Sequence, residues 1–472
     1  MVRQALLTTR RFGGAVGAIV ALVGQPGWAD ELTADGSADR AVRASYDAVA
    51  ARSMQVAAQA GVDQASYAFL PRVSVSATST RLSDFTPSPL FPFAIVATDA
   101  PAGTLSPPSV STGSVSIAPI LDMYALDATL TVPITDYVLR LPRGLEAAKR
   151  GRHAADWQTV LVEARARLAG KIAFYEWLRA NASVDTAAQS VTEQRAHLAE
   201  VTSQIKQGDA SRADALRVDS AVASAEAILA EANAQRATAE VRLRTLLHLP
   251  GSASLTTRDA VNLPLDSVVR TQSELLDVAY RTRAELRGLE AAAATARAQA
   301  SVARATYVPT VGAFATAMYA NPSPRYFPPV SAWHGTWAVG LAVTWSPTDI
   351  PGARARASEA DARGDALAAQ RGALRDAIAV EVVQYLESAR AADAKVVATN
   401  KQLESASEAY RVTRSLFANS RATTSNVLDA ETDLARARLA WVNARIDARI
   451  ARARLEHAIG RDQSKAVRAS RH

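Results

Sequence analysis

The sequence predicts a mostly helical protein that also carries a small set of membrane β-strands and is built from two similar halves. Three observations support this fold class. Long alanine-rich stretches contain almost no helix breakers. Four shorter segments are strand-like, and in three of them apolar residues alternate with polar or small ones. Two stretches that resemble each other lie at corresponding places in the two halves.

The composition favours long, closely packed helices. Hydrophobic residues make up 49% of the chain, aromatic residues only 6%, and much of the apolar fraction is alanine. The chain contains no cysteine, which excludes disulfides and a lipid anchor on a cysteine. The charges are spread along the chain and form no concentrated basic face, so we expect no binding to nucleic acid.

The two ends of the chain are expected to lie outside the fold. Residues 1–29 have the features of a signal peptide: three arginines precede an apolar run over 13–24 that is too short to cross a membrane. The small residues Gly27 and Ala29 predict cleavage just before Asp30. Residues 461–472 are basic and poor in apolar residues, and we expect them to be disordered.

The helices fall into two halves of the same plan, residues 30–250 and 272–460, joined by a connector over 251–271 with a loop and a short strand. The expected helices span 39–68, 143–206 and 211–248, then 272–305, 353–418 and 423–460. The helix over 143–206 would be about 95 Å long, and the two shorter helices of that half together about 100 Å. The second half gives similar values. Two short helices stacked end to end would therefore match one long helix, as in a tube of uniform height.

Four strands are expected over 73–80, 126–134, 307–319 and 336–345. In the last of these, Trp337 and Trp345 lie on the same apolar face, at its two ends. Aromatic residues at both ends of a strand are typical of the girdles of an outer-membrane barrel. The alternative is a half-buried strand of a soluble sandwich with both tryptophans in its core. Both faces of 307–319 are apolar or small, so its phase stays open.

Four strands cannot close a barrel, since the smallest barrels have about eight. Several chains would therefore share one barrel. The strands of each half are joined by a proline-rich loop, over 83–120 and 321–335. Long loops of such barrels are usually extracellular, and the helices would then leave from the other side.

The repeated stretches are GDASRADALRVDSAVA (208–223) and SRATTSNVLDAETDLA (420–435). They share Ala210/Ala422, Leu216/Leu428 and Ala223/Ala435, with similar residues at Asp214/Asn426 and Asp219/Glu431. Each stretch lies between a long and a shorter helix. They predict two equivalent helix turns.

These turns, together with FLPRVSVSA (69–77), its counterpart YVPTVGAFA (307–315) and RAELRGLEAAAATARAQ (283–299), resemble the TolC-type outer-membrane efflux protein family over nearly all of the mature chain. The resemblance implies a homotrimer in which each protomer gives four strands to a 12-stranded β-barrel in the outer membrane. The helices would form a periplasmic α-helical barrel. The implied function is an exit duct without cofactors. It would serve an inner-membrane RND or ABC transporter through a periplasmic adaptor protein, and the pump would decide between small-molecule efflux and type I protein secretion.

The resemblance also implies a gate at the turns. Three copies of Asp429 would form a carboxylate ring, weakened here because Asn426 stands where the family often has a second acid. Some family members latch a Tyr and an Arg onto an Asp of the other turn. The matching positions here are Asp214, Phe417 and Ala422, with Arg421 beside the last, so an Asp214–Arg421 contact is a hypothesis. Alternatively, Asp429 is a solvated acid near a helix start.

Contact with the adaptor is expected at Gly208 and Leu216 of the first turn and at Ser420 and Leu428 of the second. Glycine permits a tight turn, and leucine offers an apolar side chain to a partner. The alternative for the leucines is ordinary packing between helices.

Catalytic and metal-binding functions are not supported. The six histidines form no pair at a metal-ligand spacing (His153, His197, His248, His334, His457, His472), and the chain has no glycine-rich phosphate loop or nucleophile elbow. Two non-enzymatic alternatives remain. A periplasmic adaptor would lack strands with paired tryptophans, and a coiled-coil adhesin would show Leu, Ile and Val heptads without a duplication.

Overall fold

The computed structural model describes residues 31–84, 91–97, 109–115, 119–251 and 271–463, with a few residues of the connector at 255–257, 259, 261 and 264. The expected signal peptide, most of the basic tail and parts of the 83–120 loop lie outside the described residues.

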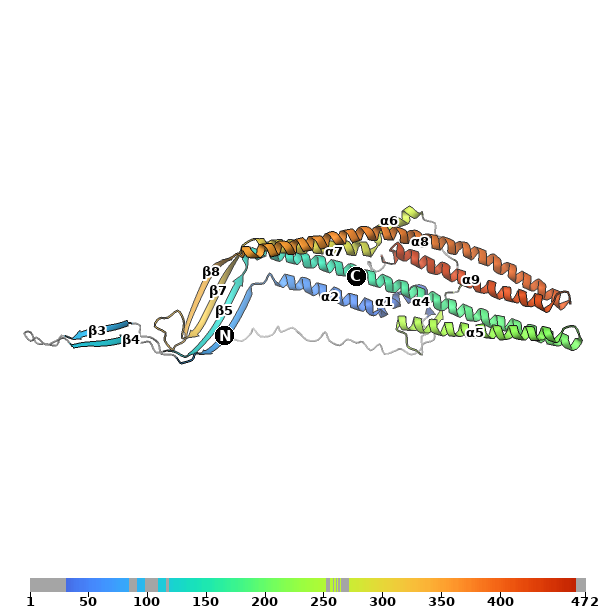
Figure 1. Ribbon diagram of the computed structural model, residues 1–472, viewed down its shortest axis with the longest axis horizontal. Helices are drawn as coiled ribbons and strands as arrows, with labels where there is room; N and C mark the ends of the chain where they lie inside the picture. The colour runs from blue at the N-terminus through green and yellow to red at the C-terminus, as the bar shows by residue number, and fades with distance from the viewer. Residues whose placement is uncertain are drawn as a thin grey trace, which may run out of the picture.

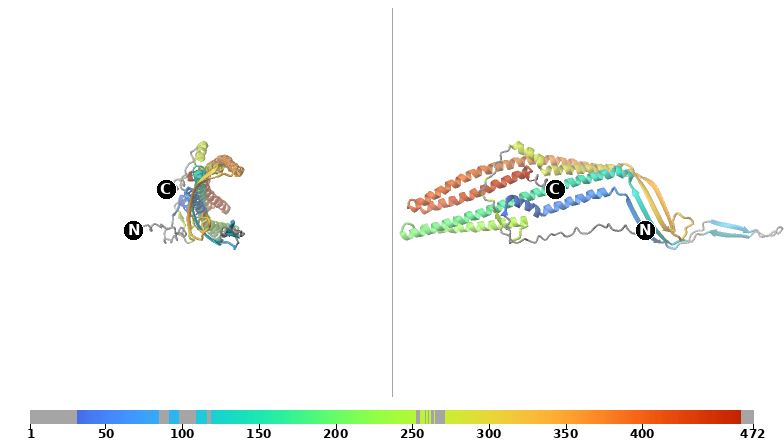
Figure 2. Two further views of the ribbon diagram at one scale, coloured as in Figure 1. Left: turned by 90° about the vertical axis from the view of Figure 1, so that its left-hand side faces the viewer. Right: turned by 180° about the vertical axis from the view of Figure 1, so that it is seen from behind.

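A small sheet lies at one end of the elongated molecule, and the helices run from it to the opposite end (Figure 1). Seen along its length, the protomer is a curved layer rather than a round bundle (Figure 2). The first half consists of α1 (Ala34–Ala44), α2 (Tyr46–Tyr67), β2 (Arg72–Arg81), β5 (Asp122–Val132), α3 (Ile134–Val138), α4 (Arg140–Gln207) and α5 (Arg212–Leu247). The second half consists of α6 (Gln272–Thr282), α7 (Ala284–Arg304), β7 (Thr310–Asn321), β8 (His334–Thr344), α8 (Ile350–Ala418) and α9 (Thr424–Ala458), with one-turn 3₁₀ helices at Ala305–Tyr307 and Pro347–Asp349.

The four long strands form one antiparallel sheet in the order β2-β5-β7-β8. Its register settles the phase of the third strand, because Ala317 lies opposite Trp337 and Ala313 opposite Leu341. The alanines of β7 therefore share a face with the large apolar residues of β8. On that face Trp337 is 75% exposed and Leu341 is 72% exposed. Such exposure of large apolar side chains is costly in water.

The other face of the sheet carries small and hydroxyl-bearing side chains. For example, Ser74, Thr129 and Thr316 lie across from one another on neighbouring strands. A Cβ at Gly340 would lie 2.7 Å from the ring of Phe314. The ring of Phe314 therefore has room over β8 because position 340 is a glycine. The sheet thus has an apolar face and a mostly polar or small face, as the alternation of the sequence predicts.

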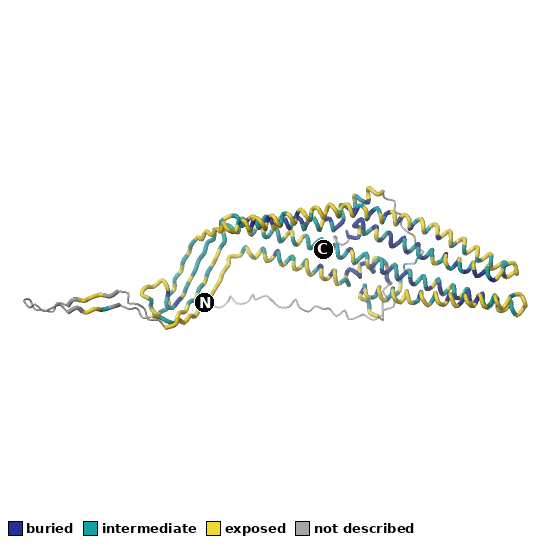
Figure 3. The backbone as a smooth tube through the Cα atoms, in the orientation of Figure 1, coloured by how far each residue is buried: buried dark blue, intermediate teal, exposed yellow. Residues whose placement is uncertain are grey.

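Both edges of the sheet are open in the protomer. β2 and β8 each have one strand neighbour among the described residues, and every residue of β2 is exposed (Figure 3). An edge strand leaves a row of backbone groups without a partner. This sheet is therefore incomplete as a structural unit.

We expected the proline-rich segment between the first two long strands to be a loop, but part of it is regular. It contains a hairpin of β3 (Phe91–Ala97) and β4 (Ser109–Val115), which extends beyond the sheet, away from the helices (Figure 1). The prolines of this segment indicated a loop. Nevertheless, Pro92 is part of the β3–β4 ladder, where it lies opposite Ser114.

The short strand expected in the connector is confirmed as β6 (Thr256–Thr257). Its partner β1 (Glu31–Leu32) was not predicted, and the two run parallel. Leu32 is buried with Phe174, Trp177 and Leu247. The first described residues are thereby fixed at mid-height of the helical part.

Two helices predicted to be continuous are broken. The helix over 39–68 begins at Ala34 and breaks at Ser45, and the helix over 272–305 breaks at Arg283. The two residues have nearly the same extended backbone, with φ and ψ of −63° and 121° at Ser45 and −63° and 118° at Arg283. At Ser45 the hydroxyl accepts a hydrogen bond from the Ala48 amide at 3.3 Å and so caps the next helix.

The long helices pack as predicted. α4 contacts α1, α2 and α5, and α8 contacts α6, α7 and α9, so in each half two shorter segments and the following helix line one long helix. Buried residues of α4 recur every seven residues at Ala173, Ala180, Ala187, Gln194 and Val201, which is the coiled-coil period. α4 also contacts α9 and thereby joins the two halves. Among the described helices, none has a stretch long and apolar enough to cross a bilayer.

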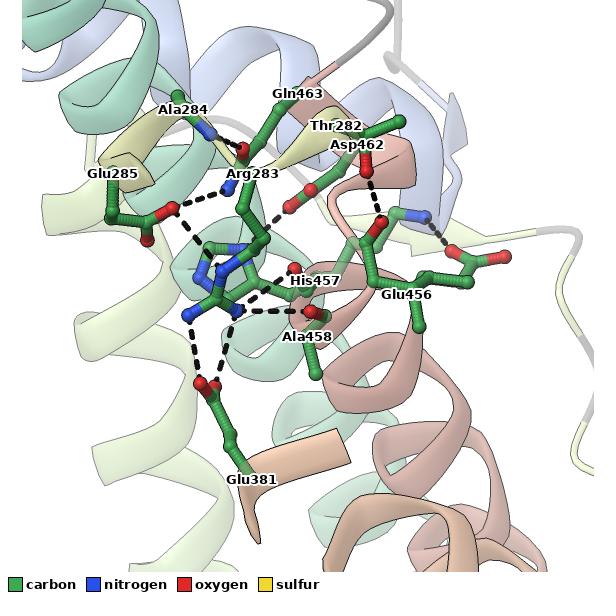
Figure 4. Close-up of polar contacts among 12 residues, drawn as sticks. Thr282, Arg283, Ala284, Glu285, Glu381, Glu456, His457, Ala458, Asp462 and Gln463 are labelled. Carbon is green, nitrogen blue, oxygen red and sulfur yellow. Dashed lines mark hydrogen bonds and ion pairs between the residues drawn. The ribbon is translucent and has the colours of Figure 1, made fainter. Parts of the chain in front are cut away.

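Arg283 fastens the end of α9 to the break between α6 and α7 (Figure 4). Its side chain is 5% exposed and makes two contacts with Glu381, the shorter being 2.7 Å from Nη2 to Oε2. Nη1 donates to the carbonyl of Ala458 at 3.1 Å, and Nε lies 3.2 Å from Oε2 of Glu285. The guanidinium therefore satisfies a free carbonyl at a helix end and two carboxylates at once.

The contacts of Arg283 predict a large stability difference between two arginine variants. Replacing Arg283 with Met leaves Glu381, Glu285 and the Ala458 carbonyl without their partner, so we expect a loss of about 3 kcal/mol or more. Arg287 of α7 pairs with Glu290 at the surface, at 3.2 Å. The Arg287→Met control should cost below about 1 kcal/mol. Denaturant midpoints of the two purified variants measure the difference, and equal midpoints would contradict the role of Arg283.

Candidate functional site at the helix turns

The two turns that reverse the long helices lie side by side at the end of the molecule opposite to the sheet (Figure 1). The first joins α4 to α5. There Gly208 has a left-handed backbone with φ of 86°, and the Asp209 amide donates to the Gln204 carbonyl at 3.0 Å. Glycine adopts this conformation without strain. The second turn joins α8 to α9, and there Ser420 takes the left-handed position with φ of 57°.

Both turns end in the same capping box. The amide of Asp214 donates to the Ser211 hydroxyl at 3.2 Å, and the Ser211 amide donates to the Asp214 carboxylate at 3.2 Å. In the second turn, Thr423 and Asn426 make the same two bonds, at 3.3 and 3.0 Å. Asp214 and Asn426 thus have the same capping role, because the box needs only a side-chain oxygen at this position to accept the hydrogen bond. This explains why the repeat tolerates the difference in charge.

Asp214 is held in its ionised form. The hydroxyl of Ser211 donates to its carboxylate at 2.6 Å, and this bond, followed by the Ser211 amide and the charge of Arg217, lowers the pKa of Asp214 below its usual value. Three donors or cations therefore face this carboxylate within its own turn. Among the described contacts, none joins Asp214 to Arg421, and that pairing stays a prediction.

An arginine whose counterpart in the other copy is Asp429 links the two turns. Nη1 of Arg217, on α5, donates to the hydroxyl of Ser425, on α9, at 2.8 Å. In the repeat, Arg217 aligns with Asp429, so the duplicated position has opposite charges in its two copies. That contrast was the available signal, and the structure shows that it serves a contact across the turns.

The predicted turn residues differ in accessibility. Phe417 is 4% exposed and Leu428 is 9% exposed, and both belong to an apolar cluster with Val201, Val218 and Val427. Within the protomer neither side chain is available as a gate latch or a docking knob, and for Leu428 the alternative of packing between helices holds. Sequence position alone did not reveal this, because burial depends on the neighbouring hairpin.

The remaining turn residues are accessible. Leu216 is 60% exposed, although it aligns with the buried Leu428. Asp429 and Arg421 are also exposed. The two copies of the turn therefore present different surfaces: the first offers an apolar side chain and the second offers a carboxylate.

Above the turns, a buried polar pair escaped the sequence analysis. Nδ1 of His197, on α4, lies 3.2 Å from Oε2 of Glu431, on α9, and each side chain is 3% exposed. The histidines were considered there only as metal ligands. Glu431 aligns with Asp219 in the repeat, and this acidic position was the signal available. The described residues contain no group of His, Asp and Glu side chains that could hold a metal ion.

The second predicted site lies on the sheet. Trp337 and Trp345 are 75% and 55% exposed, as expected for side chains that face a lipid bilayer. Near the first of them, the ring of Trp333 stacks on Tyr319 with centroids 4.9 Å apart and lies 6.2 Å from Tyr124. These three aromatic residues extend the apolar face at the end of the sheet away from the helices, and the sequence analysis did not single them out.

The two capping boxes predict different responses to acid. Because the pKa of Asp214 is lower in the turn than its usual value of 3.8, its ionised form stabilises the first turn above that pH, and this contribution is lost as the pH falls through the lowered pKa. Asn426 has no charge to lose. Amide-exchange protection of the first turn should therefore fall between pH 5 and pH 2.5, while that of the second turn changes less.

Asp214→Asn should remove this acid sensitivity, and Asn426→Asp should introduce it into the second turn. The exchange of each turn's amides, corrected for the intrinsic pH dependence, measures both effects. If both turns responded equally to acid in the unmodified protein, the assignment of the response to Asp214 would be wrong.

Comparisons with known proteins agree with this architecture. Residues 275–461 match the family model of the outer membrane efflux protein. No curated protein sequence matches the chain.

Solved outer-membrane proteins have the same fold. The outer-membrane channel OprN is 20% identical, with 92% of this chain and 91% of that chain covered and a TM-score of 0.69. VceC from Vibrio cholerae is 19% identical over 90% and 96%, with a TM-score of 0.67. The open state of the MtrE channel from Neisseria gonorrhoeae is 18% identical over 90% and 88%, with a TM-score of 0.70. Residues 275–461 thus match the outer membrane efflux protein domain, and the chain as a whole has the fold of these solved outer-membrane channels.

Proposed function

We propose that this protein is an outer-membrane channel and forms the exit duct of a tripartite export machine. The sheet carries the argument: one face is apolar and exposed, with aromatic residues at both ends, and both edges are open. Pairing β8 of one copy with β2 of the next would satisfy both edges. Three copies would give a closed barrel of twelve strands, with the apolar face toward lipid.

The long helices then extend into the periplasm as an α-helical barrel. Export depends on the predicted signal peptide over residues 1–29, and a chain without cysteine has no thiol for a lipid anchor. The proposed partners are a periplasmic adaptor and an inner-membrane RND or ABC transporter, which selects between small-molecule efflux and type I protein secretion. The exposed Leu216 is the turn residue that we propose for contact with the adaptor, and capture of the adaptor by a Leu216→Asp variant would measure that contribution.

The turns would surround the periplasmic mouth of the trimer. Asp429 is exposed on the second turn of α9 and has no partner among the contacts of the described residues. Three such carboxylates around one axis would attract cations and repel anions. Asn426 has a neutral side chain, which its capping box engages, so it adds no charge to this ring. In the trimer, Arg421 could still approach an Asp214 of a neighbouring copy.

The barrel proposal predicts that the two faces of β8 tolerate charge differently. Leu341→Arg places a cation on the proposed lipid face, at an expected cost of about 2–4 kcal/mol near the middle of the bilayer. Ala342→Arg places it on the opposite face, where water would fill the lumen. We expect heat-modifiable trimers and single-channel conductance from outer membranes with the unmodified protein and with Ala342→Arg. Leu341→Arg should give a strongly reduced amount of trimer.

The outcomes separate the alternatives. A soluble monomer without conductance would favour a periplasmic adaptor or a coiled-coil protein over a channel. Equal assembly of both arginine variants would mean that the apolar face of β8 does not contact lipid.

The mouth proposal predicts a change in ion selectivity. Asp429→Asn removes the proposed carboxylate ring and should lower the cation-to-anion permeability ratio by roughly twofold or more. Asp219→Asn is the matched control, because Asp219 is also exposed and lies on the corresponding helix of the other hairpin. Reversal potentials in planar bilayers under a salt gradient measure both. An unchanged ratio in Asp429→Asn would show that Asp429 is an ordinary solvated acid.

A further inference from the structure

The helical part near the turns consists of two helical hairpins, α4–α5 and α8–α9. Inside the first hairpin, α4 and α5 are joined by apolar contacts, such as those of Val184 with Ala232 and of Val201 with Val218. Between the hairpins, α5 and α9 are separated by a groove of about 1590 Å³ whose lining includes Ala180, Ser183 and Ala187 of α4. The hairpins are therefore joined chiefly through the contact of α4 with α9.

The junction between the hairpins is a seam of polar contacts that runs toward the turns. Farthest from the turns, Lys171 of α4 bonds Glu456 of α9 at 3.3 Å, and Arg179 of α4 bonds Asp447 of α9 at 2.6 Å. Closer to them, Arg438 of α9 bonds Glu193 of α4 at 2.8 Å. At the turns themselves, Arg217 bonds Ser425 at 2.8 Å. These contacts are partly or largely exposed to solvent, so each contributes little alone.

One contact of the seam is different, because it is fully buried. The His197–Glu431 pair is 3% exposed on both sides and lies roughly 10–17 Å along its helices from the turns. The ring of Phe417, from α8, packs edge-on against His197 with centroids 5.4 Å apart. Nε2 of His197 is buried and has no hydrogen-bond partner in the described structure. Burying such a pair gains little stability compared with apolar packing.

A buried polar pair of this kind can define how two packed elements fit together, because separating it or shifting its register leaves both groups without a partner. We propose that His197 and Glu431 form an internal latch between the two hairpins, and that this latch sets how readily the periplasmic mouth opens. The proposal rests on the channel function proposed above. His197 and Glu431 act as positioning residues, since neither reaches the exposed surface of the mouth.

The charged and titratable groups around the pair come from three helices. α8 contributes Tyr410 and Arg414, whose Nη1 donates to the Tyr410 hydroxyl at 3.1 Å. α4 contributes Glu193 and α9 contributes Arg438, while α5 presents Ala215, Val218 and Ala221 to the adjoining cluster. Burial and the charge of Glu431 raise the pKa of Tyr410, so its phenol stays neutral below pH 8.

The test compares single-channel opening of the purified trimer with that of latch and control variants. His197→Ala and Glu431→Ala should each raise the open probability at least about fivefold, and the double variant should add little to either, because the two residues act as one unit.

Two controls separate the latch from general loosening. Arg195 and Glu226 pair at 2.6 Å within the first hairpin, so Arg195→Ala should leave opening unchanged. Thr399 is buried and bonds within its own helix at 2.8 Å, so Thr399→Val tests whether any change at a buried polar position affects opening. Unchanged opening in the latch variants, additive effects in the double variant, or equal effects in Thr399→Val would each overturn the proposal.

A second measurement does not depend on conductance. Amide exchange at both turns, over residues 208–211 and 419–423, should increase in His197→Ala and Glu431→Ala and stay unchanged in the two controls. If the unmodified protein formed no channel, the proposed function would fail. The exchange data would still show whether the pair holds the hairpins together, and unchanged exchange would refute the latch itself.

Discussion

The open sheet is the constraint on which the rest of the molecule depends. Four strands leave two unsatisfied edges, and their apolar face has no cover among the described residues. Neither problem can be solved within one chain, because the helices leave from one end of the sheet and do not fold over it (Figure 1). Association with further copies and burial in lipid would solve both at once. The length and curvature of the helical part then follow, because each protomer supplies only a sector of the tube.

The helical part depends on how its breaks and ends are satisfied. At mid-height the first and second halves use the same backbone conformation, at Ser45 and Arg283, to redirect a short helix along a long one. Ser45 caps the next helix with its hydroxyl, whereas Arg283 uses its guanidinium to hold the end of α9. The same geometry is thus stabilised locally in one half and by a long-range contact in the other. The contacts of Arg283 therefore connect the end of α9 to the break between α6 and α7.

The turns show the same divergence of two similar units. Their capping boxes are equivalent, so both helices begin in the same way. The side chains that follow differ in charge and burial: Leu216 is exposed where Leu428 is buried, and Arg217 reaches across to Ser425 where Asp429 stays in solvent. Two copies of one local structure can therefore give a periplasmic end with distinct apolar, cationic and anionic positions. The buried His197–Glu431 pair lies at the junction of the two hairpins, where any relative movement of the hairpins would change the distance between the two side chains.

Features that depend on neighbours along the chain were determined by the sequence itself. The long helices, the alternation of the long strands and the two helix turns follow from local periodicity and were predicted, whereas the capping boxes at Ser211 and Thr423 were not singled out. Tertiary structure alone decided the phase of β7, because its two faces are similar until Trp337 and Leu341 pair with its alanines. It also decided the break at Arg283, the burial of Phe417 and Leu428, and the pairing of His197 with Glu431. These depend on groups more than ninety residues apart in the chain, and burial and pairing over such distances leave no periodic signal in the sequence.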